Sequence, residues 1–232
     1  MEPALIRELI FRTHHILYHS ADWMSWNLFL AIVPLALSVL LFRQVGQSFS
    51  MPLEQRSRSL FWWLGVAVFV AFLPNAPYIL TDIIHFVTAV QAGESIWAVT
   101  LILVPLYGLF LFAGFEAYVI SLINLGSFLK RTGRARWIRK AELLLHFLSA
   151  IGIYLGRFLR FNSWDIVTRL DVLATSVLDD VLGKRPLLAI AVTFLIIAGL
   201  YGLLKPVHLA LAEYWKSRSK SRSLSSVNSS GL

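Results

Sequence analysis

The strongest constraint on this chain is a set of four long stretches that contain no Asp, Glu, Lys or Arg. They cover residues 23–42, 59–81, 95–115 and 186–204. Each holds about 20 residues, the length that an α-helix needs to cross a hydrocarbon core of about 30 Å. The chain is 57% hydrophobic and only 15% charged, which is unusual for a soluble domain. The sequence therefore predicts an all-α, polytopic bundle of transmembrane helices.

The charge and cysteine content exclude several other classes. The formal net charge is +8, but the basic residues flank apolar stretches instead of gathering on one folded face, so no nucleic-acid partner is expected. Without cysteine, the chain can form neither a disulfide nor a thiolate metal site. Membrane lipids are the expected partners, and the sequence indicates no particular protein partner and no cofactor.

Five spans are predicted, with polar segments around them. The stretch 96–125 would measure about 45 Å as one helix, so we expect it to tilt, protrude or break near Pro105 and Gly108. The segment 1–25 reads as an amphipathic interfacial helix, 163–182 as a surface helix, and 213–232 as a disordered, basic, Ser-rich tail. The predicted transmembrane domain is 26–212, with spans at about 26–42, 60–80, 96–125, 141–161 and 187–204.

The distribution of basic residues predicts the topology. The segment from Lys130 to Lys140 carries six Lys or Arg residues and acts as a topology determinant. Placing it in the cytoplasm, together with the loop after span one and the C-terminal tail, puts most of the 21 Lys and Arg residues inside. The N-terminus is then outside and the C-terminus cytoplasmic.

The segment FLPNAPYILTDIIHF, residues 72–86, combines a helix break with polar side chains. Pro74 and Pro77 disfavour helical conformation in the residues before them, so we expect span two to break near 74–77 and to restart. A break at membrane depth must be covered by protein or must line a hydrated cavity. In the restarted helix a phenol, a hydroxyl, a carboxylate and an imidazole share one stripe: Tyr78, Thr81, Asp82 and His85.

A second polar cluster, GRFLRFNSWD, follows span four. Arg157 and Arg160 are spaced i, i+3, and Asn162, Trp164 and Asp165 come next. Spans two and four end on the same side of the membrane, which the predicted topology makes extracytoplasmic. Upstream, Gly152 and Gly156 form a G-x-x-x-G pair that allows close approach of another helix.

The motif PNAPYILTDIIH, together with RFLRFNSWD, resembles an uncharacterised bacterial membrane family, the domain of unknown function thirteen-sixty-one. The resemblance covers about residues 26–204 and implies a multi-pass protein of the bacterial cytoplasmic membrane, without an assigned activity. By this resemblance, the residues that match the family's polar motif are Asn75, Pro77, Tyr78, Thr81, Asp82 and His85.

Three functions compete for these residues, and the sequence leaves open whether the protein is an enzyme. The favoured hypothesis is a site that binds or modifies an anionic lipid or a lipid-linked headgroup, because Arg157 and Arg160 can bind a phosphate through bidentate hydrogen bonds. Asp82 or His85 would act as a base or an orienting group, and Tyr78 would donate a hydrogen bond. The remaining ligand-binding candidates are Asn75, Thr81, Asn162, Trp164 and Asp165.

The alternatives give the same residues other roles. In a non-catalytic structural or assembly subunit, Asp82 and His85 would pair with the two arginines and join span two to span four. A metal-dependent membrane hydrolase would use Asp82, His85 and Asp165 as ligands, but the nearby arginines oppose a cation, so no metal site is predicted.

Two further titratable groups stand apart from these clusters. Glu116 lies within span three, and its expected partner is His146 or a proton of its own. His15 and His19 are spaced i, i+4, but on a predicted interfacial helix they read as solvated surface.

Overall fold

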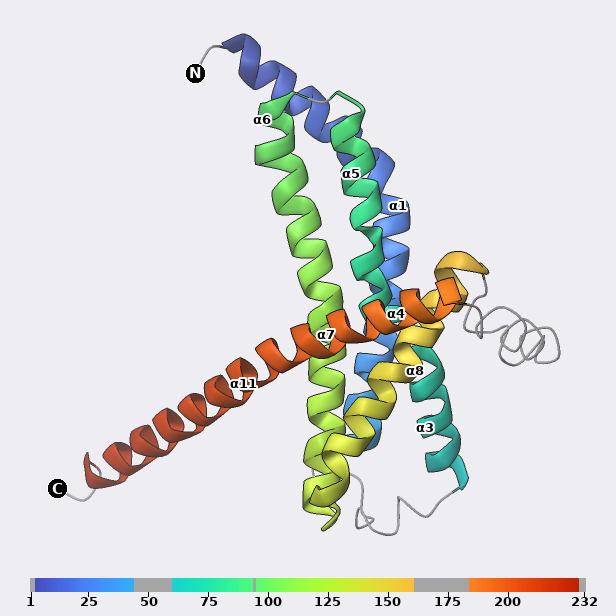
Figure 1. The fold of residues 1–232 in the computed structure, drawn as a ribbon. Coiled ribbons are helices and arrows are strands. Elements are labelled where there is room, and N and C mark those ends of the chain that lie inside the picture. Colours follow the sequence, from blue (N-terminus) through green and yellow to red (C-terminus); the bar gives the residue numbers. More distant parts are fainter. Residues whose placement is uncertain (1–2, 44–59, 94, 161–183, 230–232) are drawn as a thin grey trace.

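The computed structural model describes residues 3–43, 60–93, 95–160 and 184–229, and this part of the chain forms helices and turns without a strand (Figure 1). Its five segments that are long and apolar enough to cross a membrane are Ser20–Phe42, Leu60–Gln91, Ile96–Arg131, Ala135–Phe158 and Arg185–Trp215. The predicted all-α architecture and the five spans are therefore confirmed. The predicted surface helix at 163–182 lies outside the described residues.

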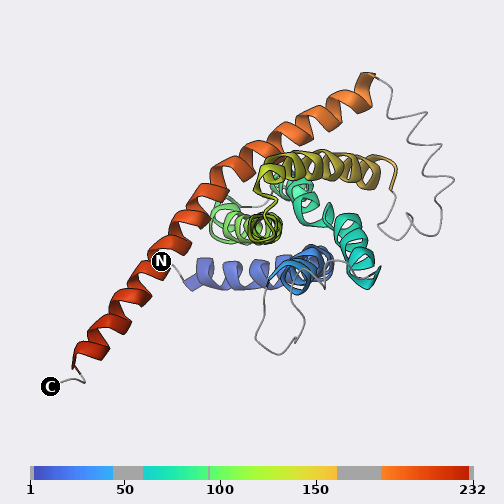
Figure 2. The ribbon, with the colours of Figure 1, turned by 90° about the horizontal axis from the view of Figure 1, so that it is seen from below.

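The described elements follow one another along the chain from α1 to α11. Their bounds are α1 (Pro3–Phe42), α3 (Leu60–Phe72), α4 (Asn75–Tyr78), η1 (Ile79–Asp82), α5 (Ile83–Gln91), α6 (Ile96–Ala98), η2 (Val99–Leu103), α7 (Val104–Arg131), η3 (Ala135–Trp137), α8 (Ile138–Phe158) and α11 (Lys184–Ser229). Helices α1 and α7 pack along each other, and the segments from α3 to α5 lie against them (Figure 1). Helix α8 contacts α4 and α7, and α11 packs mainly on α8. Figure 2 shows α11 lying across the bundle instead of parallel to α7.

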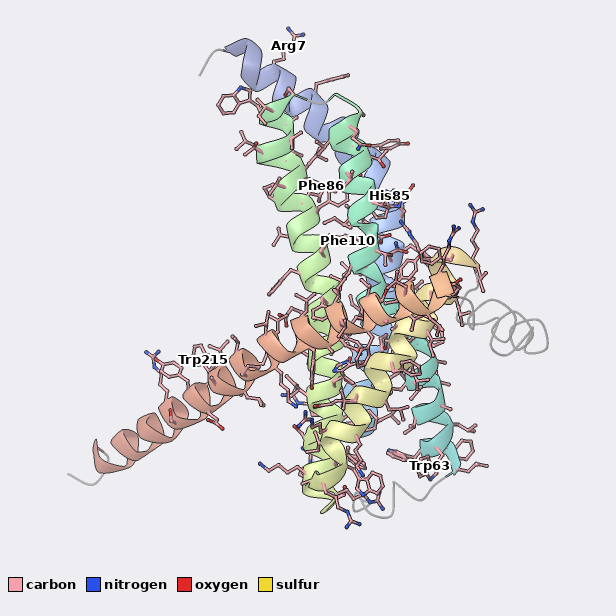
Figure 3. All side chains as sticks on the ribbon, in the orientation of Figure 1. Arg7, Trp63, His85, Phe86, Phe110 and Trp215 are labelled. Carbon is pink, nitrogen blue, oxygen red and sulfur yellow. The ribbon has the colours of Figure 1, made fainter. Side chains whose placement is uncertain are left out.

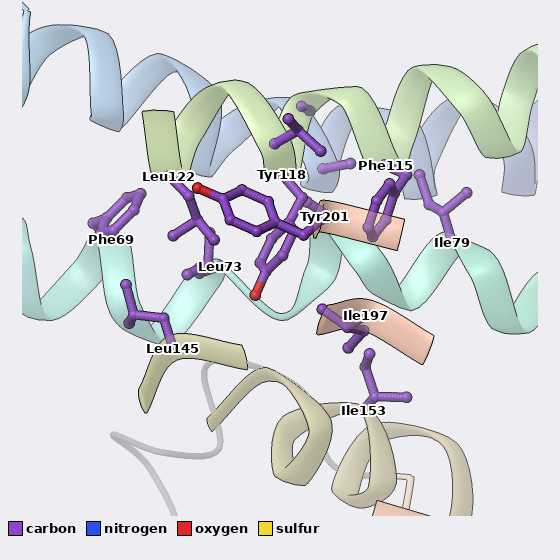
Figure 4. Close-up of a cluster of buried hydrophobic side chains, with 14 of the residues drawn as sticks. Phe69, Leu73, Ile79, Phe115, Tyr118, Leu122, Leu145, Ile153, Ile197 and Tyr201 are labelled. Carbon is purple, nitrogen blue, oxygen red and sulfur yellow. The ribbon is translucent and has the colours of Figure 1, made fainter. Parts of the chain in front are cut away.

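The core of the bundle lies where α7, α8, α11 and the interrupted second span meet (Figure 4). Its buried side chains include Phe69, Leu73, Ile79, Phe115, Tyr118, Leu122, Leu145, Ile153, Ile197 and Tyr201. Many other large apolar side chains face outward along every span. Such exposure is unfavourable in water but matches a bilayer, whose acyl chains are as apolar as these side chains.

Two helices are longer than the sequence analysis expects. The predicted interfacial segment 1–25 and span one form the single helix α1, since residues 3–42 contain no glycine; Pro3 stands at the first helical position and Pro34 lies within the helix. Helix α11 continues through Ser229, across the tail that the sequence analysis expects to be disordered. Its Lys, Arg and Leu residues favour helix, and extending an existing helix costs far less than starting one.

The third span does not break at Gly108. Helix α6, the π-helical turn η2 and α7 continue one another from Ile96 to Arg131. Pro105 has no N–H to donate to the carbonyl four residues earlier, at Leu101, and that carbonyl belongs to the π-helical turn. The helix absorbs Pro105 by widening one turn instead of breaking.

The second span is interrupted at Leu73 and Pro74. Helix α3 ends at Phe72, and the Phe72 carbonyl accepts a hydrogen bond of 2.9 Å from Asn75 Nδ2. The Leu73 carbonyl accepts from Ala76 N–H at 3.2 Å instead of from Pro77, which has no N–H. The interruption thus satisfies its own carbonyls within one turn.

Two glycines hold neighbouring helices close to this interruption. A Cβ on Gly152 of α8 would lie 2.7 Å from Cβ and Cγ of Pro74, and one on Gly114 of α7 would overlap Ile79. Protein therefore covers the interrupted backbone on both sides, as a break at membrane depth requires.

Candidate functional site

Asp82 is the buried centre of the polar site. Its side chain is 1% exposed, at the end of η1. Asn27 Nδ2, from α1, donates a hydrogen bond of 2.8 Å to Asp82 Oδ2. Arg157 Nη1, from the last turn of α8, lies 3.5 Å from Asp82 Oδ1. One carboxylate therefore links three spans that are far apart in the sequence.

Arg157 covers the outer side of this carboxylate. Its Nη2 donates to the Thr81 carbonyl at 3.3 Å, and its Nη1 donates to the Tyr78 hydroxyl at 3.5 Å. The guanidinium also lies 5.9 Å from the centre of the Tyr78 ring, within the range of a cation–π contact. Its side chain is 26% exposed, so the guanidinium joins the buried carboxylate to the surface.

His85 lies one turn beyond Asp82 and is far more open. Its Nε2 is 4.0 Å from Asp82 Oδ1, and its side chain is 50% exposed. The ring packs against Trp23 of α1 with centroids 4.7 Å apart, and Trp23 in turn meets Phe110 of α7 edge to face (Figure 3). Packing holds the imidazole beside the carboxylate while one of its faces stays accessible.

The other predicted site residues on this segment serve the backbone. Thr81 Oγ1 donates to the Tyr78 carbonyl at 2.7 Å. The Asn75 amide caps the Phe72 carbonyl at the interruption. Both side chains stabilise the turn that presents Asp82.

The structure separates the two arginines that the sequence places on one helix face. Helix α8 ends at Phe158, and Arg160 lies beyond it, exposed, with a backbone φ of 58° in the left-handed region. Of the two, only Arg157 contacts Asp82, because Arg160 is no longer on the same helix. Three predicted ligand-binding residues lie outside the described part of the chain: Asn162, Trp164 and Asp165.

The site lies about one membrane thickness away from the basic end of the bundle. At that basic end, Arg131 Nη2 donates to the Phe42 carbonyl and joins the C-terminal ends of α7 and α1. Phe110, which contacts Trp23 beside His85, precedes Arg131 by about 21 residues, or about 32 Å of helix. This length matches the thickness of a hydrocarbon core. The polar site and the basic end are therefore about one hydrocarbon thickness apart, while exposed apolar side chains such as Leu101 and Val104 continue the third span beyond the site.

A second polar network, between α7, α8 and α11, is missing from the sequence analysis. Glu142 Oε1 accepts hydrogen bonds from Lys205 Nζ at 2.6 Å and from Tyr201 Oη at 2.7 Å. His146 Nδ1 lies 2.8 Å from Tyr118 Oη. The i, i+4 spacing of Tyr201 and Lys205 on one face of α11 is the local signal that could have indicated this network.

The prediction that Glu116 pairs with His146 is wrong. Glu116 Oε2 lies 2.5 Å from Nε2 of His208 on α11, whereas His146 pairs with Tyr118. Helix α11 crosses α7 at the level of Glu116, so the partner comes from span five and not from span four.

A metal site finds no support in the described residues, which contain no group of three or more His, Cys, Asp or Glu side chains placed to hold an ion. Asp82 and His85 supply two such groups beside the Arg157 guanidinium, whose charge opposes a cation.

Apolar helices of membrane-spanning length around these buried polar groups define an integral, multi-pass membrane protein of the helical-bundle class. The family model described as "Protein of unknown function (DUF1361)" matches residues 26–198. The chain belongs to this family, and the matched region includes the interrupted span, Asp82 and Arg157 but ends before Lys205 and His208. Neither a curated protein nor a solved structure matches the chain.

Proposed function

We propose that the protein binds the anionic headgroup of a lipid, or of a lipid-linked phosphate, at the site formed by Tyr78, Asp82, His85 and Arg157. The observation that carries the proposal is the geometry of Arg157. Its described contacts run through the two terminal nitrogens at 3.3–3.5 Å, longer than the usual 2.7–2.9 Å of charge-assisted bonds, and a quarter of the side chain is exposed. A guanidinium held so loosely can turn a planar pair of donors toward a phosphate.

The surrounding groups suit an anion of this kind. Asp82 is buried behind Arg157 and is already bonded to Asn27, so it orients the guanidinium without facing the ligand. Half-exposed His85 offers the anion a ring N–H donor beside the Arg157 guanidinium, and a positive charge when the ring is protonated. The distance of about 32 Å from the basic end, close to the thickness of a hydrocarbon core, supports a position of these groups at headgroup depth. The topology predicted from the basic residues puts them on the extracytoplasmic side.

The headgroup proposal predicts that lipid retention depends on the shape of the cation at position 157. In native mass spectrometry of the protein released from nanodiscs of phosphatidylglycerol and phosphatidylcholine, we expect Arg157→Lys to retain less phosphatidylglycerol than the parent, because a point charge replaces the planar fork. The matched control is Arg139→Lys, at an exposed arginine near the opposite end of α8. Equal retention by the two variants would contradict the proposal.

A second variant protects this test against a folding defect. His85→Gln removes the half-exposed imidazole, which holds no helix in place by a hydrogen bond among the described contacts. We expect it to keep the parent's unfolding temperature and to lose part of the phosphatidylglycerol retention.

A purely structural role is the second candidate, because Asp82 links α1, η1 and α8 while almost fully buried. In that case Arg157→Lys and His85→Gln would leave lipid retention unchanged, and only the variants that break the contacts of Asp82 would lower stability.

A further inference from the structure

The network that fastens α11 to the bundle is independent of the headgroup site. Tyr201, Lys205 and His208 are spaced i, i+4 and i+7, so they form one stripe along α11. The first two bind Glu142 of α8, and His208 binds Glu116 of α7. The stripe therefore holds α11 to two different helices.

The Glu116–His208 pair lies inside the apolar layer. Along α7, Glu116 is about 22 Å from Arg131 at the basic end, on the near side of Phe110, which marks the level of the headgroup site. Its side chain is 14% exposed, and that of His208 is 30% exposed. An unpaired charge at such a depth is costly, and intramembrane ionisable residues are therefore expected to be paired or functional.

This pair differs chemically from the neighbouring pair of Glu142 and Lys205. A lysine is a permanent cation near neutral pH, whereas an imidazole gains or loses its proton there. The carboxylate and the imidazole lie 2.5 Å apart. When the pair is neutral overall, the two groups share one exchangeable proton, in addition to the ring N–H that a neutral imidazole keeps. A second proton leaves a lone cation, and the loss of the first leaves a lone carboxylate.

The other titratable groups around the pair are already matched among the described residues. On α8, Glu142 is paired with Lys205 and Tyr201 of α11. Also on α8, His146 is hydrogen-bonded to Tyr118 of α7. These contacts leave Glu116 and His208 as the pair whose charge balance depends on one exchangeable proton.

The packing of α11 shows what the polar stripe contributes to the contact of this helix with α7. Its buried apolar side chains, Ile190 and Ile197, lie toward α8 and the core, while Leu195, Leu203 and Val207 are exposed. Two glycines on α11, Gly199 and Gly202, meet no atom within 4 Å of an added Cβ. Contact with α7 on this part of α11 thus combines the polar stripe with the ring contact of Tyr201 and the packing of Leu200 and Leu204.

We propose that Glu116 and His208 form a proton-binding site inside the membrane, and that α11 stays seated on α7 only while the pair holds one proton. Binding and release each transfer one proton between this site and water. The position of α11 then follows a bell-shaped pH profile, because α11 is seated only in the one-proton state of the pair.

Spin-label distances on the full chain in liposomes test the proposal, and the absence of native cysteine makes labelling straightforward. Labels replace Phe112 of α7 and Leu211 of α11, both exposed and each one turn from the pair. We expect one short-distance population at neutral pH. At alkaline pH, we expect the ratio of the long-distance to the short-distance population to rise about a hundredfold, since an unpaired carboxylate is costly in hydrocarbon.

Two variants separate proton binding from simple packing. His208→Lys keeps a cation that does not titrate near neutrality, so the alkaline shift should vanish. Tyr201→Phe removes a hydroxyl from Glu142 but leaves the pair intact, so the shift should remain. Distances that do not change with pH in the parent, or an equal alkaline shift in parent and His208→Lys, would overturn the proposal.

Discussion

Replacing Gly152 by alanine tests how closely α8 must approach the interrupted span. The added Cβ would lie 2.7 Å from two atoms of the Pro74 ring, which is 0.7 Å short of the 3.4 Å at which ordinary contact begins. The proline ring is rigid and sits in a turn whose carbonyls are already satisfied, so α8 itself must shift.

The expected cost is the balance of two effects. Overpacking of a tight contact costs about 1–3 kcal/mol, while replacing a helical glycine by alanine gains about 1 kcal/mol. We therefore expect a net loss of up to about 2 kcal/mol of stability. Because Arg157 lies five residues further along α8, the shift should also lengthen its contact with Asp82, which is already 3.5 Å.

The assay is thermal unfolding in mild detergent, compared with Gly199→Ala. Gly199 is also helical but meets no atom within 4 Å of an added Cβ, so this control should leave stability unchanged or raise it. If both variants were equally stable, or if Gly152→Ala were the more stable, the close approach of α8 to Pro74 would be refuted.

Two further substitutions probe the buried polar contacts. Asp82→Asn keeps the shape of the side chain but removes the counter-charge of Arg157; since Arg157 is a quarter exposed, we expect a loss of about 1–3 kcal/mol, seen as a lower unfolding midpoint. An unchanged or raised midpoint would show that the carboxylate is retained for its ligand chemistry. Asn124→Leu removes the 3.0 Å hydrogen bond from Asn124 to Ser38, between α7 and α1. We expect this substitution to lower the free energy of unfolding by about 0.6–1.7 kcal/mol, measured by thermal unfolding in mild detergent. A gain in stability would show that this bond contributes nothing.

The sequence by itself determined the elements and their environment. The uncharged stretches predict helices of membrane-spanning length, because unsatisfied backbone groups are excluded from hydrocarbon. Pro74 and Pro77 predict an interruption, because neither has an N–H and both restrict the residue before them. Local spacing likewise placed Tyr78 and Asp82 on one segment. These conclusions depend on interactions within a few residues, which the sequence displays directly.

Only the tertiary structure decided which distant side chains meet. Asn27 reaches Asp82 across 55 residues, and His208 reaches Glu116 across 92. Because α11 crosses α7, Glu116 pairs with His208 instead of His146 (Figure 2). Because α8 ends at Phe158, Arg160 lies away from the site. Helix crossing depends on packing between surfaces such as Gly152 against Pro74. The G-x-x-x-G pair indicates that some helix can approach closely at Gly152, but it does not say which one.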